Sequence, residues 1–246
     1  MYLDKKIAVV IPALNEEPSI MKVINGLTAL VDTNSGQTLI DDIVVCDNGS
    51  TDGTARIAEA SGARVVREKT PGYGAACLTA IDALDTPDIV VFLDADHSVV
   101  SEEVFLLLDE FEKGADLVVG SRVLGKQDQR ALTIPQKFGN WLASVLIRFL
   151  WKHPVTDLGP FRAICFSALQ KIDMQDKRFG WTVEMQVKAI QNQLSVVEVP
   201  VRTMKRIGYS KISGTIRGTI GAALGIFGTI FKLWSQEKQL VERVAD

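Results

Sequence analysis

The pattern most informative about chemistry is Asp94-Ala95-Asp96, which directly follows the apolar segment 88–93. That segment, Asp-Ile-Val-Val-Phe-Leu, has the composition of a buried strand. Ligands of a parallel sheet bind at the carboxyl ends of its strands, where two carboxylates one residue apart can converge on a divalent cation. Because carboxylate oxygens are hard ligands, we expect Asp94 and Asp96 to hold Mg²⁺ or Mn²⁺, which would in turn contact a diphosphate.

Two other polar segments follow apolar runs that resemble strands. Residues 12–16 (Pro-Ala-Leu-Asn-Glu) follow the first run, and residues 46–54 (Cys-Asp-Asn-Gly-Ser-Thr-Asp-Gly-Thr) end the second. In a parallel sheet both segments would lie at the same edge as Asp94. Asx and Gly residues after a strand can simply form turns and helix caps, and Asp47 or Asn48 can instead hydrogen-bond a nucleobase or a ribose. The spacing leaves both interpretations open.

The chain has 246 residues, of which 47% are hydrophobic and 23% charged, as in an ordinary globular protein. This composition excludes a disordered chain and a disulfide-stapled mini-protein. The first residues show neither an apolar signal segment nor a cleavage site, so we expect a cytoplasmic protein. The three cysteines form no CxxC pair, which disfavours disulfide frameworks and structural zinc. We expect buried, reduced thiols at Cys46, Cys77 and Cys165.

Charge is divided unevenly between the two halves of the sequence. Residues 1–120 carry 8 Lys and Arg against 21 Asp and Glu, whereas residues 121–246 carry 19 against 9. The basic half has no stripe of basic and stacking aromatic residues, so we expect no nucleic-acid partner. A phosphate-rich small ligand or an anionic membrane surface suits the basic half better.

Short apolar runs alternate with helical stretches through the first half, which is typical of βαβ units. The expected strands lie at 7–11, 40–46, 64–66, 88–93, 116–120, 161–165 and 195–204. The expected helices lie at 17–30, 52–61, 73–85, 101–113, 135–151 and 181–193. The Val- and Ile-rich strands need helices on both faces, so the predicted fold class is α/β with a mostly parallel central sheet.

Two apolar segments of the second half could lie at the surface. Apolar residues recur at helical spacing through 135–151, and we favour core packing over membrane contact for this stripe. The segment 214–234 is apolar and Gly-rich, with an uncharged run from Gly218 to Phe231. That run is shorter than the roughly 20 residues of a spanning helix, so we expect an interfacial or protein-packed helix over 214–246.

Several motifs together resemble family 2 glycosyltransferases in order and approximate spacing. They are Pro-Ala-Leu-Asn-Glu at 12–16, Asp-Asn-Gly-Ser-Thr-Asp-Gly-Thr at 47–54, Gly-Tyr-Gly-Ala-Ala at 72–76 and Asp-Ala-Asp at 94–96. The resemblance covers nearly the whole chain. The second half looks most like the polyprenyl-phosphate branch, which is similar to dolichol-phosphate mannose synthases. The residues that carry this likeness are 120–122, 156–164, 180–186 and 206–211.

The resemblance implies a Rossmann-like domain of the GT-A type over residues 1–213, with metal and nucleotide in 1–120 and acceptor and phosphates in 121–213. Asp94 and Asp96 would bind the metal. The residues implied to contact the nucleotide are Pro12, Leu14, Glu16, Cys46, Asp47, Asn48 and Ala95. The family commonly has two consecutive acids at 47–48, whereas Asn48 is an amide that both donates and accepts. Uracil is the first expectation for the base and guanine the second.

The same resemblance matches Arg122 and Lys211 to basic positions that hold phosphates, with Lys137 and Arg206 as weaker matches. The charges support this independently, because a nucleoside diphosphate and a polyprenyl phosphate bring several negative charges into one cleft. Residues 199–236 contain six Lys and Arg and no acid. A solvated basic loop is the alternative interpretation.

The acceptor decides which chemistry the protein must supply. A phosphate acceptor is anionic at neutral pH and needs no strong general base, so positioning, metal assistance and charge compensation suffice. Inversion by single displacement is what the resemblance implies. A hydroxyl acceptor would need a carboxylate to take its proton, and Asp157 or Glu184 is then the candidate. Their alternative roles are orientation of Arg162 or Arg122 and plain exposure on a helix surface.

The leading hypothesis is a metal-dependent inverting hexosyltransferase that uses a nucleotide sugar, with a UDP-sugar first and GDP-mannose second, and a polyprenyl-phosphate acceptor. It would lie peripherally at the cytoplasmic membrane face. Whether it forms a homo-oligomer is left open. The residues expected to act in catalysis are Asp94, Asp96, Arg122, Asp157 and Lys211.

A transferase to a soluble hydroxyl acceptor or a saccharide is the closest alternative. A sugar nucleotidyltransferase would need a Gly-rich, Lys-bearing loop after the first strand, which residues 12–16 do not form. A non-catalytic binder is disfavoured by the intact pair of aspartates.

Overall fold

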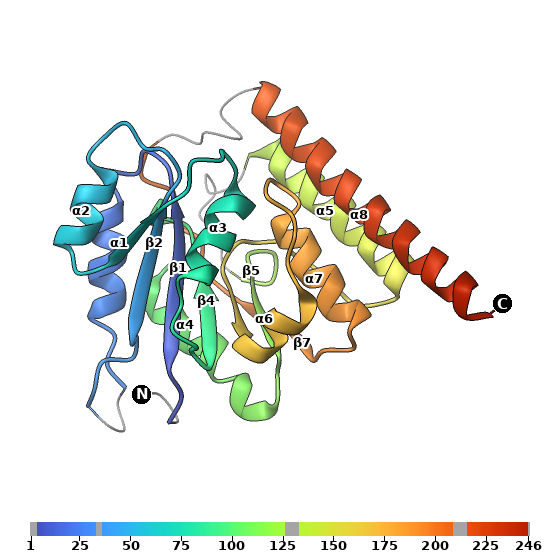
Figure 1. The fold of residues 1–246 in the computed structure, drawn as a ribbon, viewed down its shortest axis with the longest axis horizontal. Helices are drawn as coiled ribbons and strands as arrows, with labels where there is room; N and C mark the ends of the chain where they lie inside the picture. The colour runs from blue at the N-terminus through green and yellow to red at the C-terminus, as the bar shows by residue number, and fades with distance from the viewer. Residues whose placement is uncertain (1–3, 33–35, 126–132, 209–215, 246) are drawn as a thin grey trace.

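The computed structural model describes residues 4–32, 36–125, 133–208 and 216–245, which are built around a seven-stranded sheet (Figure 1). The strands are β1 (Ile7–Ala13), β2 (Asp42–Asp47), β3 (Arg64–Arg67), β4 (Ile89–Phe92), β5 (Leu117–Ser121), β6 (Arg162–Cys165) and β7 (Val196–Pro200). Their order is β3-β2-β1-β4-β6-β5-β7. All neighbours pair in parallel except β6, which is antiparallel to β4 and β5. The predicted α/β class with a mostly parallel sheet is confirmed.

Helices cover both faces of the sheet (Figure 1). Side chains alternate along a strand, so Val9 and Ile11 of β1 belong to one core and Val10 to the other. The first core lies against α1 (Ile20–Thr28) and α4 (Val104–Leu108). The second lies against α3 (Tyr73–Asp82), α6 (Phe166–Ile172) and α7 (Trp181–Gln191). A further helix, α2 (Thr54–Ala60), packs on α1 and the edge strand β3.

Three local expectations differ from the structure. The helix expected at 101–113 is broken into a 3₁₀ turn at Ser101–Glu103, the short α4, and a second 3₁₀ turn at Phe111–Lys113. Helix α6 has no counterpart among the expected elements, because it begins directly after β6 without an intervening polar turn that would signal it. The strand expected at 195–204 is shorter, because β7 ends where its partner β5 ends.

Two long helices, α5 (Ile134–Trp151) and α8 (Ile216–Ala245), lie side by side and pack on α7 (Figure 1). A capping box starts α5, in which the Thr133 side chain accepts from the Gln136 backbone N–H. A third core joins the three helices, with Ala143 and Ile147 from α5, Val183 and Val187 from α7, and Ile230 and Leu233 from α8. Within the described residues, none of the helices has both the length and the apolar character needed to cross a membrane.

The expected core packing of the 135–151 stripe is wrong for its bulkiest residues. Phe138, Trp141 and Phe149 are each more than half exposed. The fully buried face of α5 is formed instead by Ala143, Ser144 and Ile147. Apolar residues occur on both sides of this helix, so their spacing alone did not determine which side would meet α7.

The polar segments identified in the sequence meet at one edge of the sheet. The register of the parallel strands places Ala13 beside Asp47 and Val10 beside Phe92. The strands β1, β2 and β4 therefore end close together, and the loops that follow them share this edge. Because β6 is antiparallel, the segment before it, which includes Asp157, also approaches from this edge.

Candidate active site

A cavity of about 530 Å³ opens at the carboxyl edge of the sheet, a volume in the usual range for small-molecule sites. Eight of the residues singled out from the sequence line it: Pro12, Leu14, Glu16, Asn48, Asp94, Ala95, Asp96 and Arg206. The remaining lining residues are Ala13, Pro71, Gly72, Tyr73, Ala76, Arg178 and Phe179. The cavity thus brings the ends of β1, β2 and β4 together with segments far away in the sequence.

The two aspartates after β4 are buried together with few hydrogen-bond donors. The Oδ1 atom of Asp96 accepts from the backbone N–H of Ser98 at 2.9 Å. The Oδ1 atom of Asp94 is fully buried without a partner at full hydrogen-bond geometry. The Tyr73 hydroxyl lies close enough to this carboxylate to lower its pKa. Burial, and then the charge of Asp96, raise the pKa of Asp94 to about 7. The nearby arginines therefore do not fully offset the charge of this carboxylate pair.

The pair fits a divalent cation. A buried carboxylate oxygen without a partner is costly, and hard cations such as Mg²⁺ and Mn²⁺ bind such oxygens. Within the part of the chain that the structure describes, no three His, Cys, Asp or Glu side chains converge to form a metal site. Asp94 and Asp96 would therefore supply two carboxylates at most, and a substrate diphosphate and water would complete the coordination. That is the usual way in which Mg²⁺ binds at phosphate sites.

Arg206 brings positive charge into the cavity. Its Nη2 atom lies 3.3 Å from Asp96 Oδ2 and 3.4 Å from Glu16 Oε1. Its Nε atom is buried without a hydrogen-bond partner. The segment after β7 is fixed in place because the Ile207 N–H donates to the carbonyl of Asp96 at 2.9 Å. An arginine held in this way, with donor capacity to spare, is suited to binding a phosphate oxygen.

The side chain of Asn48 bonds to its own chain. Its Nδ2 atom donates to the carbonyls of Glu68 at 3.0 Å and Thr70 at 2.8 Å, and its Oδ1 accepts from the Gly72 N–H at 2.8 Å. A carboxylate in this position could make only the last of these bonds. Asn48 therefore holds the segment 68–72 that leads into the cavity wall. A base contact by this amide would have to compete with three internal hydrogen bonds.

The two residues before Asn48 do not line the cavity. Asp47 is buried, and its Oδ1 accepts from the Ser50 N–H at 3.0 Å within the turn. The thiol of Cys46 is fully buried in the second core, where burial raises its pKa to about 12. Its side chain does not line the cavity, and the nucleotide contact implied for Cys46 stays a prediction. Cys77 is also buried but Cys165 is only partly so, so the expected burial holds for two of the three free thiols.

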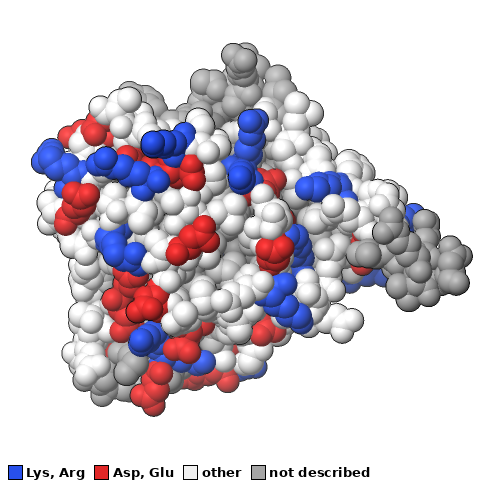
Figure 2. All heavy atoms as spheres, viewed as in Figure 1, with Lys and Arg blue, Asp and Glu red and all other residues white. Residues whose placement is uncertain are grey.

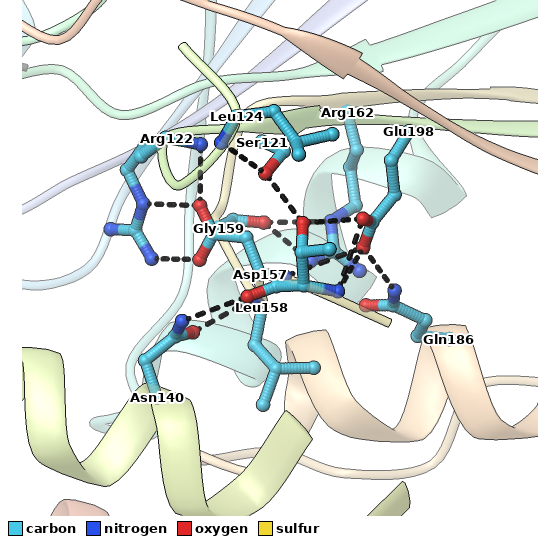
Figure 3. A network of polar contacts seen from close by, with 11 residues as sticks. Ser121, Arg122, Leu124, Asn140, Asp157, Leu158, Gly159, Arg162, Gln186 and Glu198 are labelled. Atoms are coloured by element: carbon cyan, nitrogen blue, oxygen red, sulfur yellow. Dashed lines mark hydrogen bonds and ion pairs between the residues drawn. The ribbon is translucent and has the colours of Figure 1, made fainter. Parts of the chain in front are cut away.

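Arg122 and Asp157 form a closed ion pair (Figure 3). The N–H and Nε of Arg122 donate to Asp157 Oδ2 at 2.7 and 2.8 Å, and its Nη2 donates to Oδ1 at 2.7 Å. Burial alone would raise the pKa of Asp157, but the charge and hydrogen bonds of Arg122 outweigh it and hold this pKa below its usual value. Asp157 is therefore a weak base that orients Arg122, whose charge in turn lowers the pKa of Asp94.

The segment that carries Asp157 is fixed by a larger network (Figure 3). The Thr156 N–H donates to both carboxylate oxygens of Glu198, at 2.9 and 3.0 Å, and the Leu158 N–H donates to Asn140 Oδ1 at 2.9 Å. Arg162 is fully buried and donates to the carbonyls of Gly159 and Thr182. Burial without a paired carboxylate lowers the pKa of Arg162 to about 10. These bonds make the network a rigid support beside the cavity.

Two further residues singled out from the sequence do not line the cavity. Glu184 is buried, accepts from the Asp176 N–H at 2.7 Å and pairs with Lys188 at 2.9 Å. Its expected exposure on a helix surface is therefore wrong. Lys137 is exposed on α5 and is not a lining residue. Lys211 lies outside the described residues.

Three more lining residues had no predicted role: Tyr73, which the sequence placed only within the 72–76 motif, and Arg178 and Phe179, which no motif included. The loop before α7 brings the last two to the start of α3, where the Gly74 N–H donates to the carbonyl of Arg178 at 3.2 Å. A Cβ atom on Gly74 would lie 1.9 Å from the carbonyl oxygen of Asp176, so the approach requires glycine. The glycines of the 72–76 motif were the available signal of a close backbone contact.

Glycosyl transferase family 2 matches residues 8–173 of this chain. An uncharacterised glycosyltransferase of Mycobacterium tuberculosis is 37% identical over 227 residues, which cover 91% of this chain and 97% of the relative. A dolichyl-phosphate hexose transferase of Haloferax volcanii is 30% identical, with 91% and 92% covered. A polyprenol monophosphomannose synthase of Mycolicibacterium smegmatis is 33% identical, with 75% and 80% covered.

A solved structure shares the architecture. Glucosyl-3-phosphoglycerate synthase from Mycobacterium tuberculosis, in complex with Mn²⁺, uridine diphosphate and phosphoglyceric acid, superposes with a TM-score of 0.75 at 24% identity. The match covers 94% of this chain and 79% of that one. The likeness confirms the expected arrangement of sheet and helices.

Proposed function

This chain belongs to glycosyl transferase family 2, and we propose that it transfers a hexose from a nucleotide sugar to a polyprenyl phosphate. The observation that carries the proposal is the underneutralised pair Asp94 and Asp96, which shares a cavity of suitable size with Arg206. The relatives that are named as dolichyl-phosphate hexose transferase and polyprenol monophosphomannose synthase support the lipid acceptor.

The donor would lie along the cavity. Its nucleoside would rest against Pro12, Leu14 and the segment held by Asn48, and its diphosphate would lie at the two aspartates and Arg206. Mg²⁺ or Mn²⁺, held by Asp94 and Asp96, would offset the charge that develops on the leaving diphosphate. A UDP-sugar is the first expectation and GDP-mannose the second; the structure that contains Mn²⁺ and uridine diphosphate in a protein of the same fold supports this order.

The acceptor phosphate would attack the anomeric carbon directly, and a single displacement inverts that centre. No protein base is required, because the phosphate is already anionic. This agrees with the state of the two carboxylates considered as bases, since Asp157 is paired with Arg122 and Glu184 with Lys188. Arg122 would add positive charge beside the aspartates, and we assign Lys211 to the same task.

The acceptor also suggests where the protein works. A polyprenyl phosphate lies in a bilayer, so we place the chain peripherally at the cytoplasmic membrane face, with residues 214–246 as an interfacial helix. A homo-oligomer stays a prediction. Transfer to a soluble hydroxyl acceptor is the second candidate, because the solved structure of similar fold contains phosphoglyceric acid.

The test is transfer of labelled hexose from a panel of UDP- and GDP-sugars to a short polyprenyl phosphate, with Mg²⁺ or Mn²⁺ and after chelation. We expect a metal-dependent lipid-linked product of inverted anomeric configuration, seen by chromatography and NMR. A parallel reaction offers 3-phosphoglycerate and simple sugars in place of the lipid. Label on these hydroxyl acceptors and none on the lipid would overturn the proposed acceptor.

A further inference from the structure

Helices α5 and α8 expose an apolar surface that the proposed chemistry does not use. Of the eleven large apolar side chains that are exposed among the described residues, six lie on these two helices. They are Ile134, Phe138, Trp141 and Phe149 on α5, which are 84%, 61%, 55% and 78% exposed, and Leu224 and Phe231 on α8, which are 71% and 52% exposed. These six residues are called the α5–α8 face below.

On each helix, the residues of the α5–α8 face share one side. Ile134, Phe138, Trp141 and Phe149 occupy positions i, i+4, i+7 and i+15, and Leu224 and Phe231 are seven apart, so each set shares one side. The opposite sides pack on α7 in the third core. Each helix thus has one apolar side buried in the protein and a second apolar side facing outward. Exposed apolar patches of this kind mark contact surfaces.

The charges beside the α5–α8 face indicate what it contacts. Lys137 and Arg148 of α5 and Lys232 of α8 are exposed, and no Asp or Glu occurs in 131–156 or 199–236. The described part of α8 is mostly white in Figure 2. A second copy of this chain would bring like charges together across a two-fold interface, whereas an anionic lipid surface complements them. Bulky apolar residues flanked by Lys and Arg are typical of helices that lie in a membrane interface.

Helix α8 also adjoins the cavity. Phe179 lines the cavity and lies against α8, where a Cβ atom on Gly225 would be 3.1 Å from the Phe179 Cβ. In the same loop, Asp176 Oδ2 accepts from the Thr229 hydroxyl at 3.1 Å. The cavity wall and α8 are therefore joined by direct contacts, so a surface that binds α8 also lies near the cavity.

We propose that α5 and α8 together form the membrane-docking surface of the protein. The six apolar residues enter the interfacial layer of an anionic bilayer, and Arg148 and Lys232 contact its headgroups. This inference rests on the proposed function, because it identifies the surface that brings a membrane-held acceptor to the cavity. It gives α5 the membrane contact that its apolar spacing had left as the less favoured alternative to core packing.

Vesicle flotation tests the surface without donor or acceptor. Vesicles of phosphatidylcholine and phosphatidylglycerol in equal parts, free of polyprenyl phosphate, are mixed with the full chain. We expect the wild-type protein to float and the triple variant Phe138→Ser/Trp141→Ser/Phe149→Ser to lose at least about tenfold in partition, since three bulky apolar side chains no longer leave water. The matched control Met21→Ser/Leu106→Ser, which removes exposed apolar side chains on α1 and α4, keeps wild-type partition.

A charge variant sharpens the test. Arg148→Gln/Lys232→Gln weakens flotation with the anionic vesicles and leaves the weaker binding to pure phosphatidylcholine unchanged, because each charge near an anionic surface contributes about 1 kcal/mol. Circular dichroism and thermal melting check that all variants fold. Wild-type protein that stays in solution, or a triple variant that floats like the wild type, overturns the proposal. So does a wild-type dimer that dissociates in the triple variant while neither protein floats, since the face then binds a second copy.

The docking proposal and the proposed function fail in different assays. Transfer is measured separately on detergent-dispersed polyprenyl phosphate. Transfer without vesicle binding would contradict the docking proposal and support the proposed transferase activity. Vesicle binding that depends on the α5–α8 face, without any transfer to the lipid, would support the docking proposal and contradict the proposed acceptor.

Discussion

Two acidic centres lie at the carboxyl edge of the sheet, and they are built in opposite ways. Asp157 is fully buried, yet its oxygens are bonded to Arg122. Asp94 and Asp96 face each other with one buried oxygen that has no partner and with Arg206 at the longer distance of 3.3 Å. Burial alone therefore does not distinguish a carboxylate that is fully paired within the fold from one that can still bind a metal or a substrate. The unfilled bonding capacity of a buried group does so.

The largest effect should come from Asp96→Asn. Removing one of the two carboxylates proposed to hold the metal should lower transfer at least about 1,000-fold, because charge on the leaving diphosphate is no longer offset. The free energy of unfolding should fall little, since the change also relieves repulsion with Asp94. Steady-state transfer and urea unfolding measure the two quantities.

The matched control for this variant is Glu59→Gln, which removes an exposed acid on α2 far along the chain from the aspartate pair. It should leave both transfer and stability unchanged. Wild-type turnover in Asp96→Asn would contradict the proposed metal role. Asp94 and Asp96 would then differ from Asp157 in their contacts but not in function.

The Arg122–Asp157 pair is the closed centre, and the Asp94–Asp96 pair is the open one. A substitution in the closed centre should lower stability rather than transfer. Asp157→Asn leaves the partly buried Arg122 without its counter-charge, which should cost about 3 kcal/mol in the free energy of unfolding. The pKa of Asp157 is lowered in the fold, so its contribution is present above the unfolded-state pKa near 4 and is lost as the pH falls through the lower folded value. The deficit of the variant should therefore be full at pH 7 and shrink below about pH 4. A variant with wild-type stability and wild-type pH dependence of unfolding would show that the Arg122–Asp157 pair does not stabilise the fold.

From the sequence, Asp94 and Asp96 could be placed at one edge of the sheet, whereas orientation of Arg162 or Arg122 by Asp157 was only one of several alternatives. Asp94 and Asp96 follow a clear strand, and the edge of a parallel sheet fixes where they lie. The partner of Asp157 depends on the antiparallel strand β6, and strand direction is not encoded in the apolar pattern of residues 161–165. The same limit applies to Arg178 and Phe179, which reach the cavity only through the contact of their loop with α3.

The outward side of α5 shows a second limit. The helix was predicted within one residue of its start, because its spacing and its end signals are local. Which side is buried depends on α7 and α8, and small residues such as Ala143 and Ser144 allow the closer approach. The spacing of apolar residues predicts which sides of a helix are apolar. It does not predict which of those sides another element will cover.

Asp94→Asn tests whether the open centre carries strain. The folded pKa of Asp94 is raised to about 7, first by burial and then by Asp96, so its contribution to stability is favourable below the unfolded-state pKa and is lost as the pH rises through 7. In the presence of a chelator, the variant should be more stable than the wild type at pH 8 by on the order of 2 kcal/mol. The two proteins should be equal near pH 4. Thermal melts across this range measure the difference, and a constant difference would contradict the strain.

The smallest effect is expected at Asn48. Its substitution distinguishes a residue that supports the cavity wall from one that recognises the nucleobase. Asn48→Asp loses the two bonds donated to Glu68 and Thr70 and keeps only the one accepted from Gly72, so the segment 68–72 should loosen. Titration calorimetry with UDP and with GDP, each with Mn²⁺, should show both affinities lowered about fivefold, which is close to 1 kcal/mol. Loss of one nucleotide alone, with the other unchanged, would mean that this side chain reads the base. The amide would then belong to the open centre rather than to the scaffold around it.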